Sequence, residues 1–399
     1  MRSRTIQRYT RTDKFIWLVT LLYLVVSNTL IGGGRVLFAF AGTVLLFTNF
    51  KLRVYKYHLF TLQFVIYCYA TTFWALNGRY TIPICNSMFL TLMCLFIFYE
   101  YWKDIKDIHI LLKIIMWAGL FVVVYTYYFY GVEDIVTADG GTRLGNEFNN
   151  VNVIAMMTAT TLIINFYFML FVKKDWSILI WLPCLFIIGA TQCRKAFVML
   201  VMGMFLMYYY KQRMKKNGDM LLPLTKVFVF VLIGFLILFI LGHNGIFSGL
   251  YTRMGGMISS LTGGEDVDAS SMVRNIYNEI GWKQFLKTPI VGIGINNSMI
   301  LLAQQVNHAT YLHNNYIELL TCGGVIGLIS YYSIFVYLLY QEQKYIKLES
   351  SAFLIVTWLL IIFVIDWGVV SYVNRMNYFY LMMFFIHLDH LKKKYPHIR

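Results

Sequence analysis

The chain has 399 residues, of which 59% are hydrophobic and 13% are charged, and its mean hydropathy is +0.63. Soluble globular proteins carry about 25% charged residues, so this composition excludes that class and indicates an integral membrane protein. The formal net charge of +15 would suit nucleic-acid binding, but the placement of the basic residues argues against it.

The basic residues gather in segments that the positive-inside rule places in the cytoplasm. These segments are the N-terminal stretch 2–14, the run 211–216 and the tail 392–394. The basic excess is therefore a topology signal and an attraction to anionic inner-leaflet lipid, and no nucleic-acid partner is expected. Both termini are expected to be cytoplasmic, which requires an even number of membrane spans.

The charged and glycine-rich breaks in the sequence predict one all-α domain, 1–399, built as a bundle of twelve membrane-spanning helices. Such a helix needs about 20 apolar residues, and the shorter candidates rely on flanking aromatic residues at the interface. The first span is not a cleavable signal peptide, because no small-residue cleavage site follows it. The candidate spans are 15–31, 36–50, 59–76, 83–100, 109–131, 151–172, 176–192, 196–210, 225–242, 316–340, 352–370 and 376–390.

Six cysteines lie in or beside these apolar spans without any CxxC spacing. This pattern is typical of small core residues rather than of a disulfide framework or a metal site. No metal and no cofactor are expected, and the lack of a Walker A sequence argues against ATP hydrolysis.

The first segment expected outside the membrane with polar candidates is the loop at 132–150. It contains Arg143 and Glu147 and leads into Asn152, a secondary candidate at the start of the next span. Lysine and arginine are scarce on this side, so Arg143 is a candidate ligand for an anion. Glu147 is a candidate general base, although a structural partner for an arginine is the more ordinary role.

Arg194 follows an apolar span at a short outer turn, in GATQCRKAFVML. An arginine in that place costs free energy unless it faces a cavity or a partner. A snorkelling interface anchor is the alternative interpretation, but the neighbouring Lys195 favours an anion site. Arg143, Arg194 and Arg274 are predicted to hold a diphosphate, because guanidinium makes bidentate, charge-assisted contacts to phosphate oxygens.

The longest segment outside the membrane, 243–315, is predicted to form a lid. Within it, SSMVRNIYNEIGWKQFLKTP reads as an amphipathic helix, with apolar residues at i, i+3, i+4 and i+7 counted from Val273. Ser271 is predicted to cap this helix, and Pro289 with the following glycines to end it. Such a helix lies along the outer membrane interface or folds back over the bundle.

Asp266 and Asp268, ahead of this helix, have the DxD spacing by which some glycosyltransferases hold a metal and a nucleotide. The segment is expected on the outer side, where nucleotide sugars are absent, and it is flanked by glycine. A solvated loop is therefore the favoured interpretation.

His313 stands at the start of the tenth span and is the leading candidate for a catalytic group. An imidazole that titrates near neutrality suits a general base that takes a proton from a hydroxyl. A lone histidine at a helix start is more often an interface residue, but Asn314 and Glu318 give this helix a polar first turn. Glu318 is also an alternative base or an arginine partner. Gly323 and Gly327 form a GxxxG pattern that lets another helix pack closely.

Asp366 lies within the eleventh predicted span, in IIFVIDWGVV. Intramembrane carboxylates are functional candidates, and a nearby cation is the expected partner. That partner is expected to be Arg375 or one of the site arginines, and a buried structural ion pair is the alternative to a functional role.

Several of these segments together resemble the bacterial O-antigen ligase/polymerase superfamily, the WaaL-like and Wzy-like membrane glycosyltransferases of the GT-C type. RLGNEFNNVN resembles the family's arginine-led stretch before a span, and CRKA is an imperfect counterpart of its Ser-Arg-Gly turn. MVRNIYNEIGWKQFLKTPIVGIG resembles its arginine-led helix ending in Pro-x-x-Gly-x-Gly. HNNYIELLTCGGVIG resembles its His-Asn helix with a Gly-x-x-Gly pattern, and the whole resemblance covers about 140–340.

The resemblance implies glycan transfer from an undecaprenyl-diphosphate-linked donor to an acceptor at the outer face of a bacterial cytoplasmic membrane. It implies that Arg194 and Arg274 hold the diphosphate, with Arg143 assisting, and that Arg274 belongs with His313 in the catalytic centre. His313 would activate the acceptor hydroxyl, with inversion at the anomeric carbon and without metal. Such chemistry is coherent, because the protein need only neutralise a good leaving group and position the nucleophile.

A polymerase that joins lipid-linked repeat units into O-antigen, capsule or exopolysaccharide is favoured, because no acceptor-binding domain is evident in the sequence. A ligase that moves finished glycan to lipid A core or to protein is the alternative. A transporter or flippase is disfavoured, because the polar groups gather on one face and no matching halves are seen. A separate flippase and a chain-length regulator are candidate partners.

Overall fold

A computed structural model describes residues 9–29, 33–48, 51, 53–105, 107–137, 144, 150–172, 179–214, 225, 251–252, 254–256 and 269–398. Within these ranges the regular secondary structure is helical and no residue lies in a β-strand. The α-helices are α1 (Arg11–Ser27), α2 (Gly33–Leu46), α3 (Lys56–Ala70), α4 (Gly78–Trp102), α5 (Ile108–Tyr130), α6 (Val132–Thr137), α7 (Val151–Tyr167), α8 (Trp181–Ala190), α9 (Arg194–Arg213), α12 (Ala269–Lys287), α13 (Ser298–Val306), α14 (Asn315–Glu342), α15 (Ser350–Ile365) and α16 (Arg375–Lys394).

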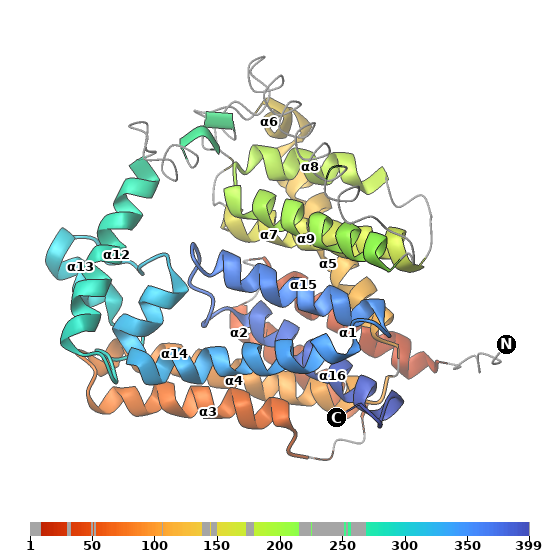
Figure 1. Ribbon diagram of the computed structural model, residues 1–399, viewed down its shortest axis with the longest axis horizontal. Helices are drawn as coiled ribbons and strands as arrows, with labels where there is room; N and C mark the ends of the chain where they lie inside the picture. Colours follow the sequence, from red (N-terminus) through yellow and green to blue (C-terminus); the bar gives the residue numbers. More distant parts are fainter. Residues whose placement is uncertain are drawn as a thin grey trace.

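Most of the long helices run back and forth along one axis, so the bundle has two ends (Figure 1). The site end holds the starts of α4, α7, α9, α14 and α16. The basic end holds the other ends of these helices, including the lysines at 392–394. Buried rings fill the space between α3, α4, α14 and α16, and Tyr57 stacks on Tyr99 with ring centroids 5.3 Å apart.

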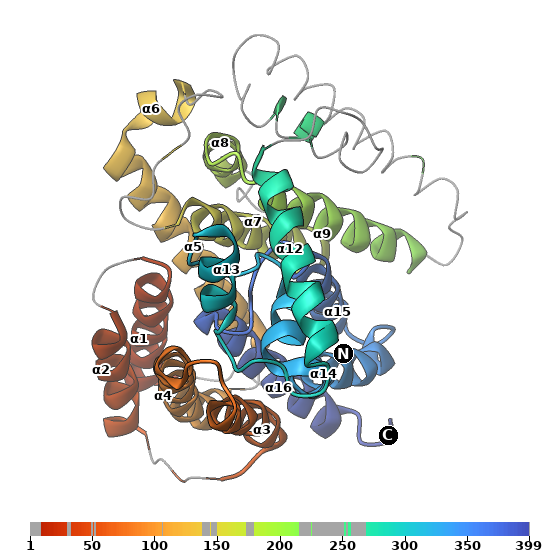
Figure 2. The same cartoon turned by 90° about the vertical axis from the view of Figure 1, so that its left-hand side faces the viewer.

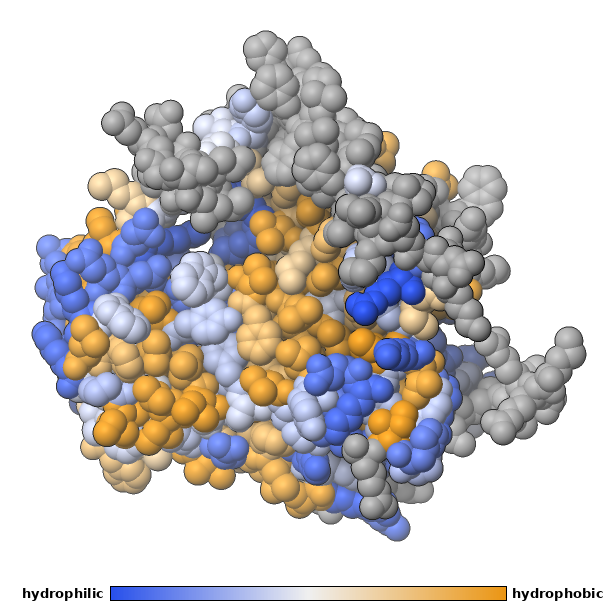
Figure 3. Space-filling view, viewed as in Figure 1, coloured by the Kyte–Doolittle hydropathy of each residue, from blue (hydrophilic) through white to orange (hydrophobic). Residues whose placement is uncertain are grey.

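Four helical segments of the described chain are long and apolar enough to cross a membrane: Gly78–Trp102, Ile108–Tyr130, Val151–Val172 and Asn315–Tyr345. Shorter apolar helices occur at Arg35–Leu46, Trp181–Ala190 and Ser350–Ile365. Apolar side chains occupy the middle of the face in Figure 3, and hydrophilic ones gather over α12 and α13. Each expected span inside the described ranges coincides with a helix, whereas 225–242 lies outside them apart from Thr225.

Asparagine side chains begin four helices at the site end. The Oδ1 atoms of Asn77, Asn150, Asn314 and Asn374 each accept a hydrogen bond from the amide two residues later, at 2.9–3.0 Å. Each cap satisfies a backbone donor that the first turn of a helix leaves unpaired. The site end is therefore lined with polar groups that the helix starts themselves require.

The helix predicted within the lid segment is present as α12, which lies across the site end with α13 beside it (Figure 2). The prediction that Ser271 caps it is wrong, because α12 begins at Ala269 and the Ser271 hydroxyl instead accepts hydrogen bonds from the Arg194 guanidinium. The predicted apolar face is half right: Tyr277 is buried, but Val273 is 42% exposed. The helix is rotated about its own axis relative to the prediction, because its polar side chains face a cavity and its glycine faces α14.

Gly281 sets how closely α12 approaches α14. A Cβ atom at this position would lie 2.6 Å from Leu312 Cδ1, 2.8 Å from Ile317 Cγ2 and 2.9 Å from Thr321 Oγ1. The Thr321 hydroxyl donates a 3.0 Å hydrogen bond to the Gly281 carbonyl. Only a residue without a side chain permits this contact.

The turn after α12 fills a break in α14 at Gly324, where φ is +62° and ψ is −168°. The backbone amides of Val325 and Ile326 donate to the carbonyls of Pro289 and Ile290 at 2.9 and 3.3 Å. In the opposite direction, the amides of residues 293 and 294 donate to the carbonyls of residues 321 and 322 at 3.0 and 2.9 Å. Backbone groups freed by the break are thus paired again, as an apolar environment requires. The nearby GxxxG glycines lie against Tyr67 of α3, as the close-packing prediction expected.

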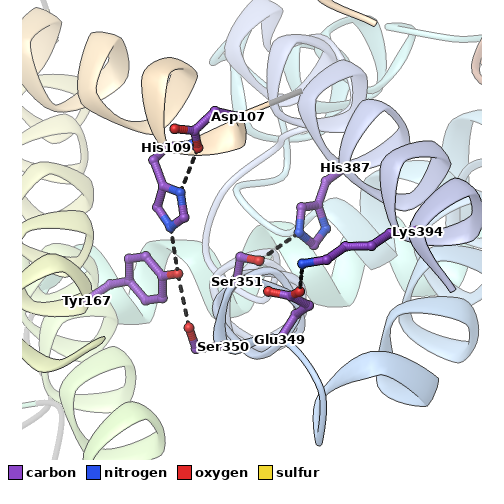
Figure 4. Close-up of polar contacts among 8 residues, drawn as sticks. All are labelled: Asp107, His109, Tyr167, Glu349, Ser350, Ser351, His387 and Lys394. Carbon is purple, nitrogen blue, oxygen red and sulfur yellow. Dashed lines mark hydrogen bonds and ion pairs between the residues drawn. The ribbon is translucent and has the colours of Figure 1, made fainter. Parts of the chain in front are cut away.

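A second polar cluster lies at the basic end (Figure 4). Ser351 Oγ lies 2.9 Å from His387 Nε2, and His387 Nδ1 lies 3.0 Å from a carboxylate oxygen of Glu342. All three side chains are buried, and they join α14, α15 and α16. A chain of contacts beside them joins α5, α7 and α15 through Asp107, His109, Tyr167 and Ser350.

Replacing Gly281 by Ala should lower the thermal unfolding temperature of the purified protein. The added methyl group overpacks the α12–α14 contact, which costs on the order of 1–3 kcal/mol. Gly42 of α2 has no atom within 4 Å of a built Cβ, so Gly42→Ala is the matched control and should leave the unfolding temperature unchanged or slightly raised. Equal unfolding temperatures for the two variants would contradict the packing described here.

Replacing His387 by Ala should destabilise the bundle by on the order of 3 kcal/mol, because it leaves the Glu342 carboxylate buried without its partner. Adding Glu342→Gln to this variant should recover part of the loss. A double-mutant cycle on thermal unfolding measures the coupling. Additive effects of the two substitutions would show that the contact contributes no pairwise stabilisation.

Candidate functional site

A cavity of about 570 Å³ lies at the site end between the start of α9, the first half of α12 and the end of α15. Four of the residues selected from the sequence line it: Asn152, Arg194, Arg274 and His313. Asn314, Glu318 and Asp366 lie near it without lining it. Arg143 and Glu147 lie outside the described residues.

Arg194 and Lys195 enter the cavity as the first two residues of α9. The positive end of a helix dipole is an unfavourable place for two cations and a favourable place for an anion. Both terminal nitrogens of Arg194 donate to Ser271 Oγ at 3.3 Å, so the guanidinium is directed toward α12. This helix start therefore supplies a positively charged wall.

The facing wall comes from α12. Ser271, Arg274, Asn275 and Asn278 stand at i, i+3, i+4 and i+7, so they share one face of the helix and all line the cavity. Within the part of the chain that the structure describes, Asn278 Oδ1 is buried and has no hydrogen-bond partner. A buried acceptor of this kind suits a hydroxyl or other donor on a ligand.

His313 is held in a left-handed backbone conformation, with φ at +59°. Such a conformation costs free energy in a residue with a side chain and persists only where its surroundings enforce it. On one side, the amide of Leu312 donates to Glu318 Oε2 at 2.9 Å. On the other side, Asn314 caps α14. Together these contacts fix the imidazole at the mouth of the helix.

Glu318 stabilises this turn by hydrogen bonds. Its Oε1 atom accepts a 2.6 Å hydrogen bond from Ser298 Oγ of α13, and its Oε2 atom accepts from the amide of Leu312. The sequence led us to expect an alternative base or an arginine partner, but its partners are a hydroxyl, a backbone amide and the Cys322 thiol. The carboxylate is buried between α13 and α14, so it faces neither an arginine nor the cavity.

Asp366 is the C-cap of α15 rather than a residue within the helix, which ends at Ile365. The expected cationic partner is also wrong: the carboxylate accepts from the Tyr332 hydroxyl at 2.7 Å and from Asn315 Nδ2 at 3.2 Å. Asn315 Oδ1 in turn accepts from the amide of Ser371 at 2.8 Å. These neutral donors satisfy the carboxylate and hold the α15–α16 connection against the start of α14. Asp366 lines a separate cavity of about 70 Å³.

Nearby positive charges affect the pKa of the His313 imidazole. Burial lowers its pKa to about 4, and the charges of Arg274, Lys195 and His308 act in the same direction. Each of these effects disfavours the protonated form. The side chain is therefore neutral at physiological pH and keeps a free lone pair.

Three rings near His313 were not selected from the sequence. The ring of Tyr311 lies 4.2 Å from the imidazole, and the ring of Tyr277 lies nearly parallel to it at 6.3 Å. The Tyr277 hydroxyl lies 2.8 Å from His308 Nδ1. Tyr311 stands only two residues before His313, so the sequence could have indicated that the two rings are close. Tyr277, in contrast, occupies a position that the sequence assigns to the apolar face of a helix.

No metal centre emerges from the described residues, since no three His, Cys, Asp or Glu side chains among them gather closely enough to hold an ion. The six cysteines are buried and unpaired, as expected of core residues. The chemical resources of the cavity are thus cations, amides and a neutral imidazole.

Residues 178–332 match the family model Wzy_C, which is described as O-Antigen ligase. The matched region includes Arg194, Arg274 and His313. This match confirms the resemblance that the sequence motifs indicated. No individual curated protein matches the chain. The protein is a multi-pass membrane protein that carries a domain of the type that transfers lipid-linked glycan.

Replacing Arg274 by Gln should raise the pKa of His313, because removing a nearby cation favours the protonated imidazole. The pKa should stay below the usual value near 6.5, since burial, its largest cause, is unchanged. The pH dependence of modification by diethyl pyrocarbonate, which reacts with neutral imidazole, measures this shift. A His313→Gln variant gives the modification of the other histidines, which is subtracted as background. An unchanged pKa would show that Arg274 is too far from His313 to influence its protonation.

Proposed function

We propose that this protein is a polymerase that joins undecaprenyl-diphosphate-linked oligosaccharide repeat units at the outer face of the bacterial cytoplasmic membrane. The observation that supports it most directly is the meeting of Arg194, Lys195 and Arg274 with His313 around one cavity. These residues come from three separate segments, so their convergence is a property of the fold. The matched family supports the same class of substrate.

The cations bind the diphosphate of the donor. Arg194 and Arg274 line the same cavity from α9 and α12, and guanidinium contacts to phosphate oxygens are bidentate and permanently charged. Arg143 is proposed to assist from the preceding loop. Because charge develops on the leaving diphosphate, a preorganised set of cations stabilises the transition state more than the ground state.

His313 takes the proton from the acceptor hydroxyl. The hydroxyl oxygen forms a bond to the anomeric carbon of the donor, and the bond from that carbon to the diphosphate oxygen breaks. The electron pair leaves with the diphosphate, and the proton passes to the imidazole. Displacement in one step inverts the configuration at the anomeric carbon, and Asn152 and Asn314 support the site as cavity wall and helix cap.

Donor binding strengthens this base. The low pKa of His313 has two kinds of cause, burial and neighbouring positive charge. A bound diphosphate offsets the positive charge and raises the pKa toward the range that suits general-base catalysis. The imidazole thus becomes an effective base when the leaving group is in place.

The topology follows from charge. The basic end carries the lysines at 392–394 and the last turn of α9 with Lys211 and Arg213. We place this end and both termini in the cytoplasm, with twelve spans in one domain and 243–315 outside as a lid. The cavity then faces the outer leaflet, where lipid-linked repeat units are presented.

A ligase is the second candidate, because the matching family is described as O-Antigen ligase. Both reactions use the same donor and differ in the acceptor. Gel analysis of surface glycan in a deletion strain separates them. Single repeat units on lipid A core would indicate loss of a polymerase, whereas accumulated long lipid-linked chains would indicate loss of a ligase.

His313→Ala should lower the glycan-transfer rate by about 10²–10⁴-fold, the usual contribution of a general base. Arg274→Ala should lower it by about 10²–10³-fold, the usual contribution of one charge-stabilising group. Long-chain surface glycan in a complemented deletion strain, with protein levels checked by immunoblot, is the measurement. Lys283→Ala on the exposed side of α12 and His397→Ala near the C-terminus are matched controls that should behave as wild type. Wild-type chain length in either site variant would remove that residue from the mechanism.

A further inference from the structure

The imidazole of His313 has two different surroundings. One is the cavity with the arginines, described above. The other is a group of rings that we call the aromatic rim: Tyr277, His308 and Tyr311. None of these three residues lines the cavity. Among the described residues, His313 both lines the cavity and contacts the aromatic rim.

The aromatic rim is open to solvent on one side and supported on the other. Tyr311 is 40% exposed and His308 is exposed as well. Tyr277 is buried, its ring lies against His313, and its hydroxyl lies 2.8 Å from His308 Nδ1. The ring planes of Tyr277 and His313 differ by only 15°. An exposed ring on a rigid, buried support is a preorganised contact surface.

Exposed polar side chains precede His308 in the chain. Gln304, Gln305 and Asn307 are exposed on the last turn of α13 and the loop that follows it. A pyranose presents apolar C–H faces and a periphery of hydroxyl groups. A tyrosine ring offers an amphipathic surface to such a face at low entropic cost, and imidazole and amide groups pair with the hydroxyls. The chemistry of this surface is that of a carbohydrate site.

The stereochemistry of the proposed reaction indicates whether this site would bind the donor sugar or the acceptor sugar. In an inverting displacement, the nucleophile and the leaving group lie on opposite faces of the anomeric carbon, and the base lies with the nucleophile. The arginines fix the diphosphate in the cavity. The acceptor hydroxyl must then reach His313 from outside the diphosphate position, and the aromatic rim lies against the imidazole without lining the cavity.

We propose that the aromatic rim binds the acceptor sugar, with Tyr311 stacked on its ring and His308 paired with a hydroxyl. This assignment rests on the proposed function and adds to it a separate acceptor subsite. Tyr311 and His308 contact substrate in this arrangement, and Tyr277 is a positioning residue. The acceptor is bound by its sugar, so an oligosaccharide without lipid or diphosphate should suffice for binding.

The test uses the full-length protein in lipid nanodiscs and two probes from the producing strain. The donor is its lipid-linked repeat unit. The acceptor is the same oligosaccharide released from the lipid by mild acid. Transfer rates are measured against the concentration of each probe, so that the Michaelis constants for donor and acceptor are obtained separately.

Tyr311→Ala should raise the acceptor KM about fivefold to tenfold, as loss of one aromatic stacking contact does, and leave the donor KM unchanged. Tyr311→Phe keeps the ring and should resemble wild type. Trp282→Ala removes an exposed aromatic residue of α12 whose ring contacts Phe285 at a tilt of 42°, so it is the matched control. His308→Ala should raise the acceptor KM as well.

An unchanged acceptor KM in Tyr311→Ala would overturn the assignment, whether or not the turnover rate falls, because a purely structural role changes kcat alone. Binding of the released oligosaccharide, followed by saturation-transfer difference NMR, gives a readout without turnover. Wild type and His313→Ala should bind it alike, and Tyr311→Ala should bind it about fivefold to tenfold more weakly. Failure of the proposed function has a different signature: Arg274→Ala and His313→Ala would then make normal glycan.

Discussion

The structure depends on one exchange of backbone hydrogen bonds, between the turn after α12 and the break in α14. At Gly324 the helix opens, and the amides and carbonyls that it releases pair with residues 289–294. This exchange fixes α12 to α14, and the missing side chain of Gly281 lets the two helices touch. Because Arg274 stands on α12 and His313 precedes α14, their distance is set by backbone pairing and not by a flexible loop.

The charges of the cavity explain the state of the imidazole. Two cations at the start of α9 and one on α12 line a cavity with a half-buried histidine. Burial lowers the pKa of this histidine, and the charges of Arg274, Lys195 and His308 act in the same direction. A site built this way is most stable when a negatively charged group enters it. In the proposed function, the same electrostatic arrangement selects an anionic ligand and couples the strength of the base to its arrival.

The two ends of the bundle show why polar residues in a membrane protein do not all have the same meaning. At the basic end, Ser351, His387 and Glu342 satisfy one another and are closed from solvent, so they hold three helices together. At the site end, Arg274 and His313 line an open cavity. In the sequence, both groups are polar residues near the ends of apolar helices. Only the packing of the helices shows which group is buried and which lines a cavity.

The sequence by itself determined the all-helical fold and the positions of most helices, including α12, and it predicted Arg194, Arg274 and His313 as site residues. These follow from hydropathy, helix caps and charge, which are properties of neighbouring residues. Only the tertiary structure decided that Ser271 receives Arg194, that Glu318 holds Leu312, that Asp366 pairs with neutral donors, and that Tyr277 and Tyr311 flank the imidazole. Each of those contacts joins segments whose distance in space depends on how whole helices pack, and no local pattern encodes that distance.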